Sequence, residues 1–177
     1  MDPLLSAIAR LFVGGLFVAA GLHKLARPTA FRNALQGHRV LPSALTVPAM
    51  ALVPAIELVA GLSSALILLP ASRIGAIACA ALLLAYAGLI GFNLVRGNRH
   101  VDCGCLGFGQ ARRELGPAMV VRNMAIAAFA LIGALPETSR ALAWLDGFSI
   151  AAGLAMLALL YAASDLAITL TLRTKAS

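Results

Sequence analysis

Two cysteines separated by a single glycine, Cys103-Gly104-Cys105, are the residues of this sequence best suited to chemistry. The Cα atoms of a disulfide usually lie about 5.5–6 Å apart, which residues at this spacing can reach if the backbone bends. Glycine permits such a bend. A small, strained disulfide is easily reduced, so the pair is expected to exchange disulfides rather than to stabilise the fold.

Basic residues flank this pair. A nearby positive charge favours the thiolate over the thiol, and the thiolate is the nucleophile in disulfide exchange. A histidine at this place could donate or accept a proton near neutral pH. The residues expected to assist the cysteines are Arg99, His100, Arg112 and Arg113.

Two other interpretations of the cysteine pair stay open. In the first, the cysteines bind a metal together with His100 and Asp102. Structural zinc sites usually leave two to four residues between cysteines and use a second pair, which is missing here. A soft ion such as Cu(I) therefore fits better than zinc. In the second interpretation, both cysteines are reduced and inert in a surface loop.

The third cysteine, Cys79, is predicted to be a small packing residue. A helix rises about 24 Å from Cys79 to Val95, at about 1.5 Å per residue, and the pair lies beyond Val95. Direct exchange between Cys79 and the pair would require a large rearrangement. A single exchanging pair needs an external partner, which is a thioredoxin-like protein, a quinone or another membrane component.

The composition is that of an integral membrane protein. Of the 177 residues, 61% are hydrophobic and only 12% are charged, and the mean hydropathy is +0.93. A soluble domain usually has about a quarter of its residues charged. The net charge of +7 does not indicate a nucleic-acid partner, because most lysines and arginines lie just outside apolar runs. At such positions they set orientation and contact lipid head groups.

Five apolar segments each have about the 20 residues that a helix needs to cross ~30 Å of hydrocarbon. An alternation with a period of two residues is absent, so membrane helices are predicted rather than barrel strands. The fold class expected is therefore all-α integral membrane, as one domain over residues 1–177 with four core helices and one C-terminal helix. The expected helices cover about residues 4–26, 47–70, 73–95, 118–136 and 147–172, and the cysteine pair lies in the loop 96–117.

The connections between these segments differ in length. A hairpin at Ala71-Ser72 is expected to join the second and third segments as antiparallel neighbours. The connection from Arg27 to Thr46 is longer and contains two prolines. It is expected to form either a short interfacial helix or a plain loop.

Polar and ionisable side chains inside the apolar runs form a second group of candidates. Charge within lipid is costly and is usually paired, so each of these residues has either a functional role or a role in fixing helix register. Glu57 is expected to pair with Arg10 or Arg122, and Lys24 to be an ordinary anchor at the membrane surface. The candidates are Arg10, His23, Lys24, Glu57, Arg122 and Asn123, together with Asn93 and Asp165.

Four short motifs carry a family resemblance. They are Gly21-Leu22-His23-Lys24-Leu25, Pro54-Ala55-Ile56-Glu57-Leu58 followed by Gly61, Asp102-Cys103-Gly104-Cys105-Leu106-Gly107, and Arg122-Asn123. The first two resemble elements of DoxX-like membrane proteins. The cysteine-loop motif narrows the resemblance to the methylamine utilisation protein MauE family, over about residues 4–172.

This resemblance implies a DoxX-like helix bundle in the bacterial inner membrane. It implies a role with a thioredoxin-like partner, MauD, in maturing the disulfide-rich small subunit of periplasmic methylamine dehydrogenase. By matching position, Cys103 and Cys105 are the redox pair, and Glu57, His23 and Arg122 are candidate positions in the bundle. A Cu(I)-binding protein and a non-catalytic assembly or scaffold subunit are the alternatives.

The charge distribution conflicts with this role. With five spans, ten basic residues fall on the side of the cysteine loop and two, Arg73 and Arg140, on the other. The positive-inside rule then places the loop in the cytoplasm. A disulfide donor for a periplasmic client requires the loop outside, so the sequence leaves its side open. The ten residues are Lys24, Arg27, Arg32, Arg39, Arg96, Arg99, Arg112, Arg113, Arg173 and Lys175.

Overall fold

The computed structural model describes residues 1–38, 42–98, 115–138, 140 and 142–176. These residues form helices and no strand, and five of the helices are long and apolar enough to cross a membrane. The prediction of an all-α integral membrane protein is therefore confirmed. The helices are α1 (Pro3–Ala26), α2 (Pro28–Gly37), α3 (Ser43–Ala65), α4 (Ala71–Val95), α5 (Pro117–Ala134) and α6 (Trp144–Ala176).

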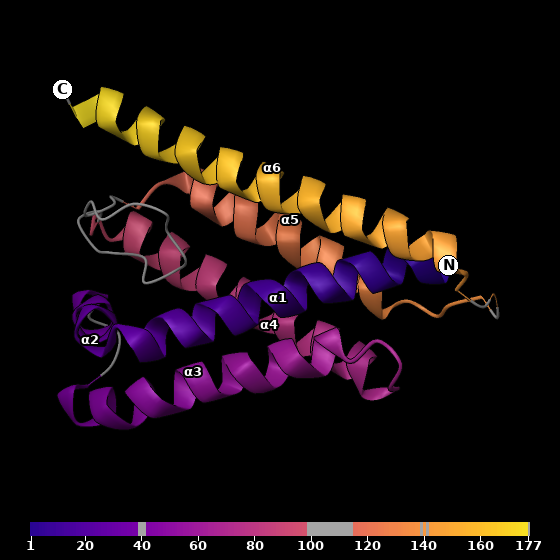
Figure 1. Ribbon diagram of the computed structural model, residues 1–177. Helices are drawn as coiled ribbons and strands as arrows, with labels where there is room; N and C mark the ends of the chain where they lie inside the picture. The colour runs from indigo at the N-terminus through magenta and orange to yellow at the C-terminus, as the bar shows by residue number, and fades with distance from the viewer. Residues whose placement is uncertain (39–41, 99–114, 139, 141, 177) are drawn as a thin grey trace.

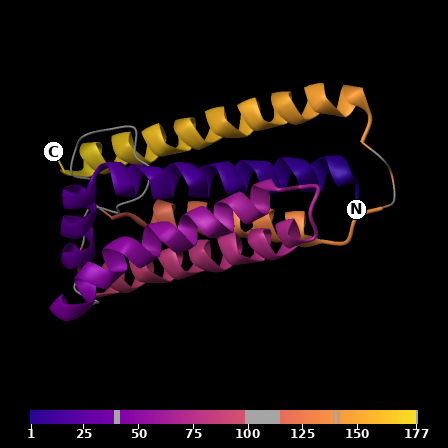
Figure 2. The same cartoon turned by 60° about the horizontal axis from the view of Figure 1, so that its bottom comes forward.

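Helices α1, α3, α4 and α5 run side by side as the core of the bundle (Figures 1 and 2). Helix α6 lies on the outside, packed mainly against α1. Only 6% of its apolar window is buried inside the protein, against 28–44% for the other four spans. The arrangement of four core helices and one C-terminal helix follows from this difference.

Local sequence explains where several helices begin and end. Helix α1 starts after Asp2, whose carboxylate accepts a hydrogen bond from the backbone N–H of Leu4 at 2.8 Å. The turn between α3 and α4 occupies residues 66–70, earlier than the predicted Ala71-Ser72, which begin α4. The predicted hairpin between neighbouring helices is confirmed, but its position was wrong. The turn is made mostly of leucine and isoleucine, which by composition belong to a membrane helix.

Small residues allow the core helices to approach closely. A Cβ atom placed on Gly75 of α4 would lie 2.2 Å from the backbone nitrogen of Ser64 in α3. A Cβ atom on Gly14 of α1 would lie 2.6 Å from the carbonyl oxygen of Gly61 in α3. Without a large hydrophobic gain between helices in lipid, such backbone contact supplies much of the packing. Cys79 is fully buried in the core cluster beside these contacts, which confirms its expected packing role.

The long connection after α1 forms a helix rather than a plain loop. Helix α2 lies across the ends of α1 and α3 (Figure 2), with Phe31 and Ala34 buried beneath it. Its last turn is tied to α4, because Asn93 bonds His38 Nδ1 at 3.1 Å and Asn98 donates to the carbonyl of Gly37 at 3.1 Å. We call this end of the bundle the α2 end.

Candidate functional site

A buried ion pair joins α1 to α3 near the α2 end. Lys24 Nζ donates to both carboxylate oxygens of Glu57, at 2.6 and 2.8 Å. Tyr86 of α4 donates its hydroxyl to Glu57 Oε1 at 2.6 Å. Glu57 is fully buried and Lys24 is 5% exposed. The three residues therefore form a polar cluster inside the bundle, which we call the Glu57 cluster.

Two expectations about these residues were wrong. Glu57 pairs with Lys24 and not with Arg10 or Arg122, and Lys24 is not a surface anchor. The close approach of α1 and α3 explains the difference. A Cβ atom on Gly21 would lie 3.2 Å from the carbonyl oxygen of Pro54, so the helices touch here. Lys24 lies three residues after Gly21, and Glu57 lies three residues after Pro54. Each residue is therefore on the helix face that makes this contact.

Aromatic rings surround the ammonium group of Lys24. Nζ lies 5.7 Å from the ring centroids of both Phe31 of α2 and Tyr86 of α4. Both distances are within the range for cation–π attraction. Contacts of this kind, together with the two hydrogen bonds to Glu57, compensate for the hydration that Lys24 loses. The pair is thus held from four helices.

A second ion pair joins α5 to α6. Arg122 Nη1 donates to Asp165 Oδ1 at 3.0 Å, and the guanidinium carbon lies 5.0 Å from the ring centroid of Tyr161. Asp165 is only 3% exposed although α6 lies on the outside of the bundle. The acidic residue that interrupts the last apolar segment is therefore paired within the protein.

Arg10 belongs to the opposite end of the bundle. It forms an ion pair with Glu137 and donates to the carbonyl of Gly133 at 2.6 Å and to Ser72 Oγ at 3.0 Å. These contacts tie α1 to α4 and to the end of α5, which is the register-fixing role left open for this residue. At the same end, the hydrogen bond and the charge of Asp146 raise the pKa of Arg140 above its ordinary value.

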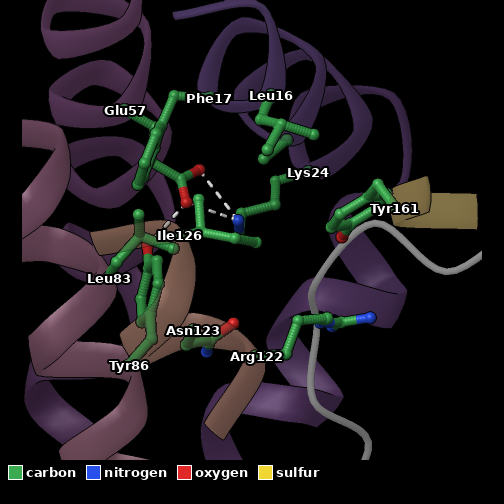
Figure 3. A pocket seen from close by; sticks show the side chains of 11 residues that line it. Leu16, Phe17, Lys24, Glu57, Leu83, Tyr86, Arg122, Asn123, Ile126 and Tyr161 are labelled. Atoms are coloured by element: carbon green, nitrogen blue, oxygen red, sulfur yellow. Dashed lines mark hydrogen bonds and ion pairs between the residues drawn. The ribbon is translucent and has the colours of Figure 1, made fainter. Parts of the chain in front are cut away.

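A pocket lies between the two ion pairs (Figure 3). It holds about 490 Å³ of space, including its open part. Its wall combines apolar side chains with a few polar groups from α1, α3, α4, α5 and α6. This is the usual composition of a small-molecule site. The lining residues are Leu16, Phe17, Ala20, Lys24, Glu57, Leu83, Tyr86, Arg122, Asn123, Ile126 and Tyr161.

The structure brings some of the sequence candidates together and leaves others apart. Lys24, Glu57, Arg122 and Asn123 line the pocket, whereas His23 does not. Tyr86 and Tyr161 were missed by the sequence analysis. They are the only two tyrosines of the chain, and a hydroxyl group inside an apolar segment was the signal that could have identified them.

The cysteine loop lies outside the described residues. This concerns the candidates Arg99, His100, Cys103, Cys105, Arg112 and Arg113, and also Asp102. The nearest described residues on either side are Asn98, bonded to Asn93 Oδ1 at 2.9 Å, and the buried Leu115, packed with Ile90 and Met119. In the part of the chain that the structure describes, no three His, Cys, Asp or Glu residues form a metal-binding group.

Comparison with known proteins places this architecture in a family. No solved structure matches the chain. A protein named methylamine utilization protein MauE from Methylophilus methylotrophus is 32% identical over 167 residues, which cover 93% of this chain and 86% of the relative. A protein of the same name from Paracoccus denitrificans is 33% identical over 131 residues, which cover 74% of this chain and 69% of the relative. Another from Methylorubrum extorquens is 32% identical over 167 residues, which cover 92% of this chain and 87% of the relative. The family model described as methylamine utilisation protein MauE matches residues 2–136, and the chain belongs to this family.

Proposed function

We propose that this protein acts in methylamine utilisation as a membrane thiol–disulfide redox protein of the bacterial inner membrane. Its partner is a thioredoxin-fold protein of the MauD type, and its client is a periplasmic protein such as the methylamine dehydrogenase small subunit. Membership of the MauE family implies the role in methylamine utilisation. The observation that carries the redox role is the Cys103-Gly104-Cys105 motif, because so small a ring favours exchange.

The proposed reaction begins with an oxidised cysteine pair. A thiolate of the partner attacks one sulfur of the Cys103–Cys105 disulfide, and the other cysteine leaves as a thiolate. The second thiolate of the partner then displaces the bound sulfur. The partner gains a disulfide and the pair becomes a dithiol, so two electrons pass from the partner to this protein. The basic neighbours Arg99, Arg112 and Arg113 favour the leaving thiolate.

The described part of the α2 end supports docking of such a partner. The exposed side chains of Arg27, Arg32 and Arg96 lie there: Arg32 is on α2, and Arg27 and Arg96 directly follow α1 and α4. They would attract an acidic partner surface and raise its rate of association. Asn98 and Leu115, which flank the cysteine loop, lie at the same end and are fixed by contacts with the bundle.

Single replacements of the two cysteines test this proposal. We expect Cys103→Ser and Cys105→Ser each to reduce disulfide transfer to background, because neither variant can form the intramolecular disulfide. The measurement is the single-turnover oxidation of a reduced thioredoxin-fold protein by the purified protein. Cys79→Ala is the matched control and keeps the wild-type rate, since Cys79 is buried in the core. Wild-type transfer by either serine variant would contradict the redox role and favour a scaffold role.

Labelling of intact cells tests on which side the pair acts. In a Cys79→Ala background, we expect a membrane-impermeant maleimide to label Cys103 and Cys105 only after reduction of the cells. This outcome corresponds to an oxidised pair outside the membrane. Labelling that occurs only after the cells are opened would place the loop in the cytoplasm, as the positive-inside rule predicts, and would contradict a periplasmic disulfide donor.

A further inference from the structure

We propose that the pocket between the two ion pairs binds the head group of a lipid-soluble quinone, whose apolar tail lies in the neighbouring groove between α5 and α6. The inference rests on the proposed function, since the quinone would be the electron acceptor that re-oxidises the cysteine pair. Four features of the pocket favour a quinone: an amide, the balance of charge, the aromatic wall and the apolar groove.

The first feature is the side chain of Asn123. It is 6% exposed and lines the pocket (Figure 3), and no hydrogen bond reaches its amide from the residues that the structure describes. The amide atoms are open to the pocket rather than sealed in the core, so a ligand in the pocket can form hydrogen bonds with them. The amide nitrogen can donate two hydrogen bonds, which suits the carbonyl oxygen of a quinone.

The second feature is the balance of charge. Lys24 is paired with Glu57, and Arg122 is paired with Asp165. Among the residues that the structure describes, the formal charges of these two pairs therefore cancel. A ligand with a carboxylate or phosphate head would bring an additional negative charge into a site whose cations are already paired, at a high desolvation cost. A neutral head group with hydrogen-bond acceptors fits this site better.

The third feature is the wall of the pocket. The rings of Phe17, Tyr86 and Tyr161 contribute to it, together with aliphatic side chains such as Leu83 and Ile126. Aromatic rings favour offset-stacked or edge-to-face contact with another flat ring. A planar head group gains this contact, which a branched lipid head group cannot make. The ring of Tyr86 is held in place by the hydrogen bond from its hydroxyl to Glu57 Oε1.

The fourth feature is an apolar groove that adjoins the pocket. The groove lies between α5 and α6, beside Phe12 of α1, and holds about 570 Å³ of space, including its open part. It shares Arg122, Ile126 and Tyr161 with the pocket, so the two spaces meet. Both helices are membrane spans and α6 is on the outside of the bundle, so a hydrophobic tail can enter from the lipid. The rest of the groove is lined by Phe12, Ala125, Phe129, Leu157, Leu160 and Ser164.

The redox step is balanced with this acceptor. The dithiol of Cys103 and Cys105 loses two electrons and two protons as the S–S bond forms and both S–H bonds break. The quinone gains two electrons and two protons, and its two carbonyl oxygens become the hydroxyl groups of a quinol. The pair is then ready to accept electrons from the partner again.

Direct binding tests the inference. A radiolabelled ubiquinone analogue with a ten-carbon tail is titrated onto the purified full-length protein in nanodiscs. We expect saturable binding, and an increase of Kd of about tenfold in Asn123→Leu, as the loss of one buried hydrogen bond implies. The matched control is Met124→Leu, because the next residue of α5 is exposed and absent from the pocket wall. Equal affinity of Asn123→Leu and wild type, or no saturable binding by wild type, would overturn the inference.

Two further measurements separate this inference from the proposed function. Pre-oxidised wild-type protein is expected to oxidise a reduced thioredoxin-fold protein in a single turnover without added quinone, because this transfer does not use the pocket. An unchanged helix content of Asn123→Leu shows that the variant is folded. The variant with both Cys103→Ser and Cys105→Ser is expected to bind the analogue with unchanged Kd. If the wild-type protein binds the analogue but does not transfer a disulfide, only the exchange role is contradicted. Displacement of the analogue by oleate at equal concentration would overturn the assignment of a neutral head group.

Discussion

Replacing Lys24 by methionine is expected to lower the free energy of unfolding by about 3–5 kcal/mol, because Glu57 is then left charged and buried without its cation. Among the described residues, only the hydroxyl of Tyr86 would still bond the carboxylate. Glu57→Gln is expected to act in the same direction, since it leaves Lys24 buried without a countercharge. The measurement is reversible unfolding of the purified protein in mixed micelles.

The double variant with Lys24→Met and Glu57→Gln tests whether the pair acts as a unit. We expect it to cost clearly less than the sum of the two single replacements, because neither buried charge remains. Arg32→Met is the control, since Arg32 is exposed on α2, and its effect is expected to stay within about 0.5 kcal/mol. Additive single effects would contradict the paired geometry of α1 and α3.

Replacing Gly75 by alanine is expected to separate α3 from α4. The added Cβ atom would lie 2.2 Å from the nitrogen and 2.8 Å from the Cα of Ser64, and 2.6 Å from the carbonyl carbon of Ser63. These are backbone atoms, which cannot move away as a flexible side chain can. Overpacking of this kind typically costs about 1–3 kcal/mol and occasionally more, and we place Gly75→Ala at the upper end. The measurement is the free energy of unfolding of Gly75→Ala and wild type in mixed micelles.

Gly88 provides the matched control on the same helix. A Cβ atom at Gly88 would meet no atom within 4 Å, and the residue is exposed. Gly88→Ala is therefore expected to leave stability unchanged or to raise it by up to about 1 kcal/mol through helix propensity. If both alanine variants unfold at the same free energy, the close approach of α3 and α4 at Gly75 is wrong.

The membrane spans could be predicted from the sequence because length and apolar composition decide them. A run of about 20 apolar residues has few alternatives to a membrane helix. The turn at residues 66–70 could not be predicted from the sequence, because its leucines and isoleucine have the same composition as the spans around it. The longer connection after α1 left two alternatives open, and burial of Phe31 and Ala34 against the bundle favours the helix.

The partners of the buried charges could not be predicted, because pairing depends on which helix faces touch. Lys24 follows directly on His23 at the end of an apolar run, so composition alone makes it a surface anchor. Only the contact of Gly21 with Pro54 turns it toward Glu57. Tyr161 and Asp165 lie beyond residues 2–136, the part matched by the family model, so a family motif would not have marked them.

The unequal lengths of α5 and α6 have a consequence for the surrounding bilayer. At about 1.5 Å per residue, the 18 residues of α5 span about 27 Å and the 33 residues of α6 about 50 Å. The length of α5 matches a hydrocarbon layer of ~30 Å, whereas the length of α6 far exceeds it. Helix α6 must therefore tilt or project into the water beyond the lipid, whereas α5 holds the local membrane near its own thickness. Since α6 is the span with the fewest buried residues, it is the one that can adjust its tilt when the protein meets a thinner or thicker membrane.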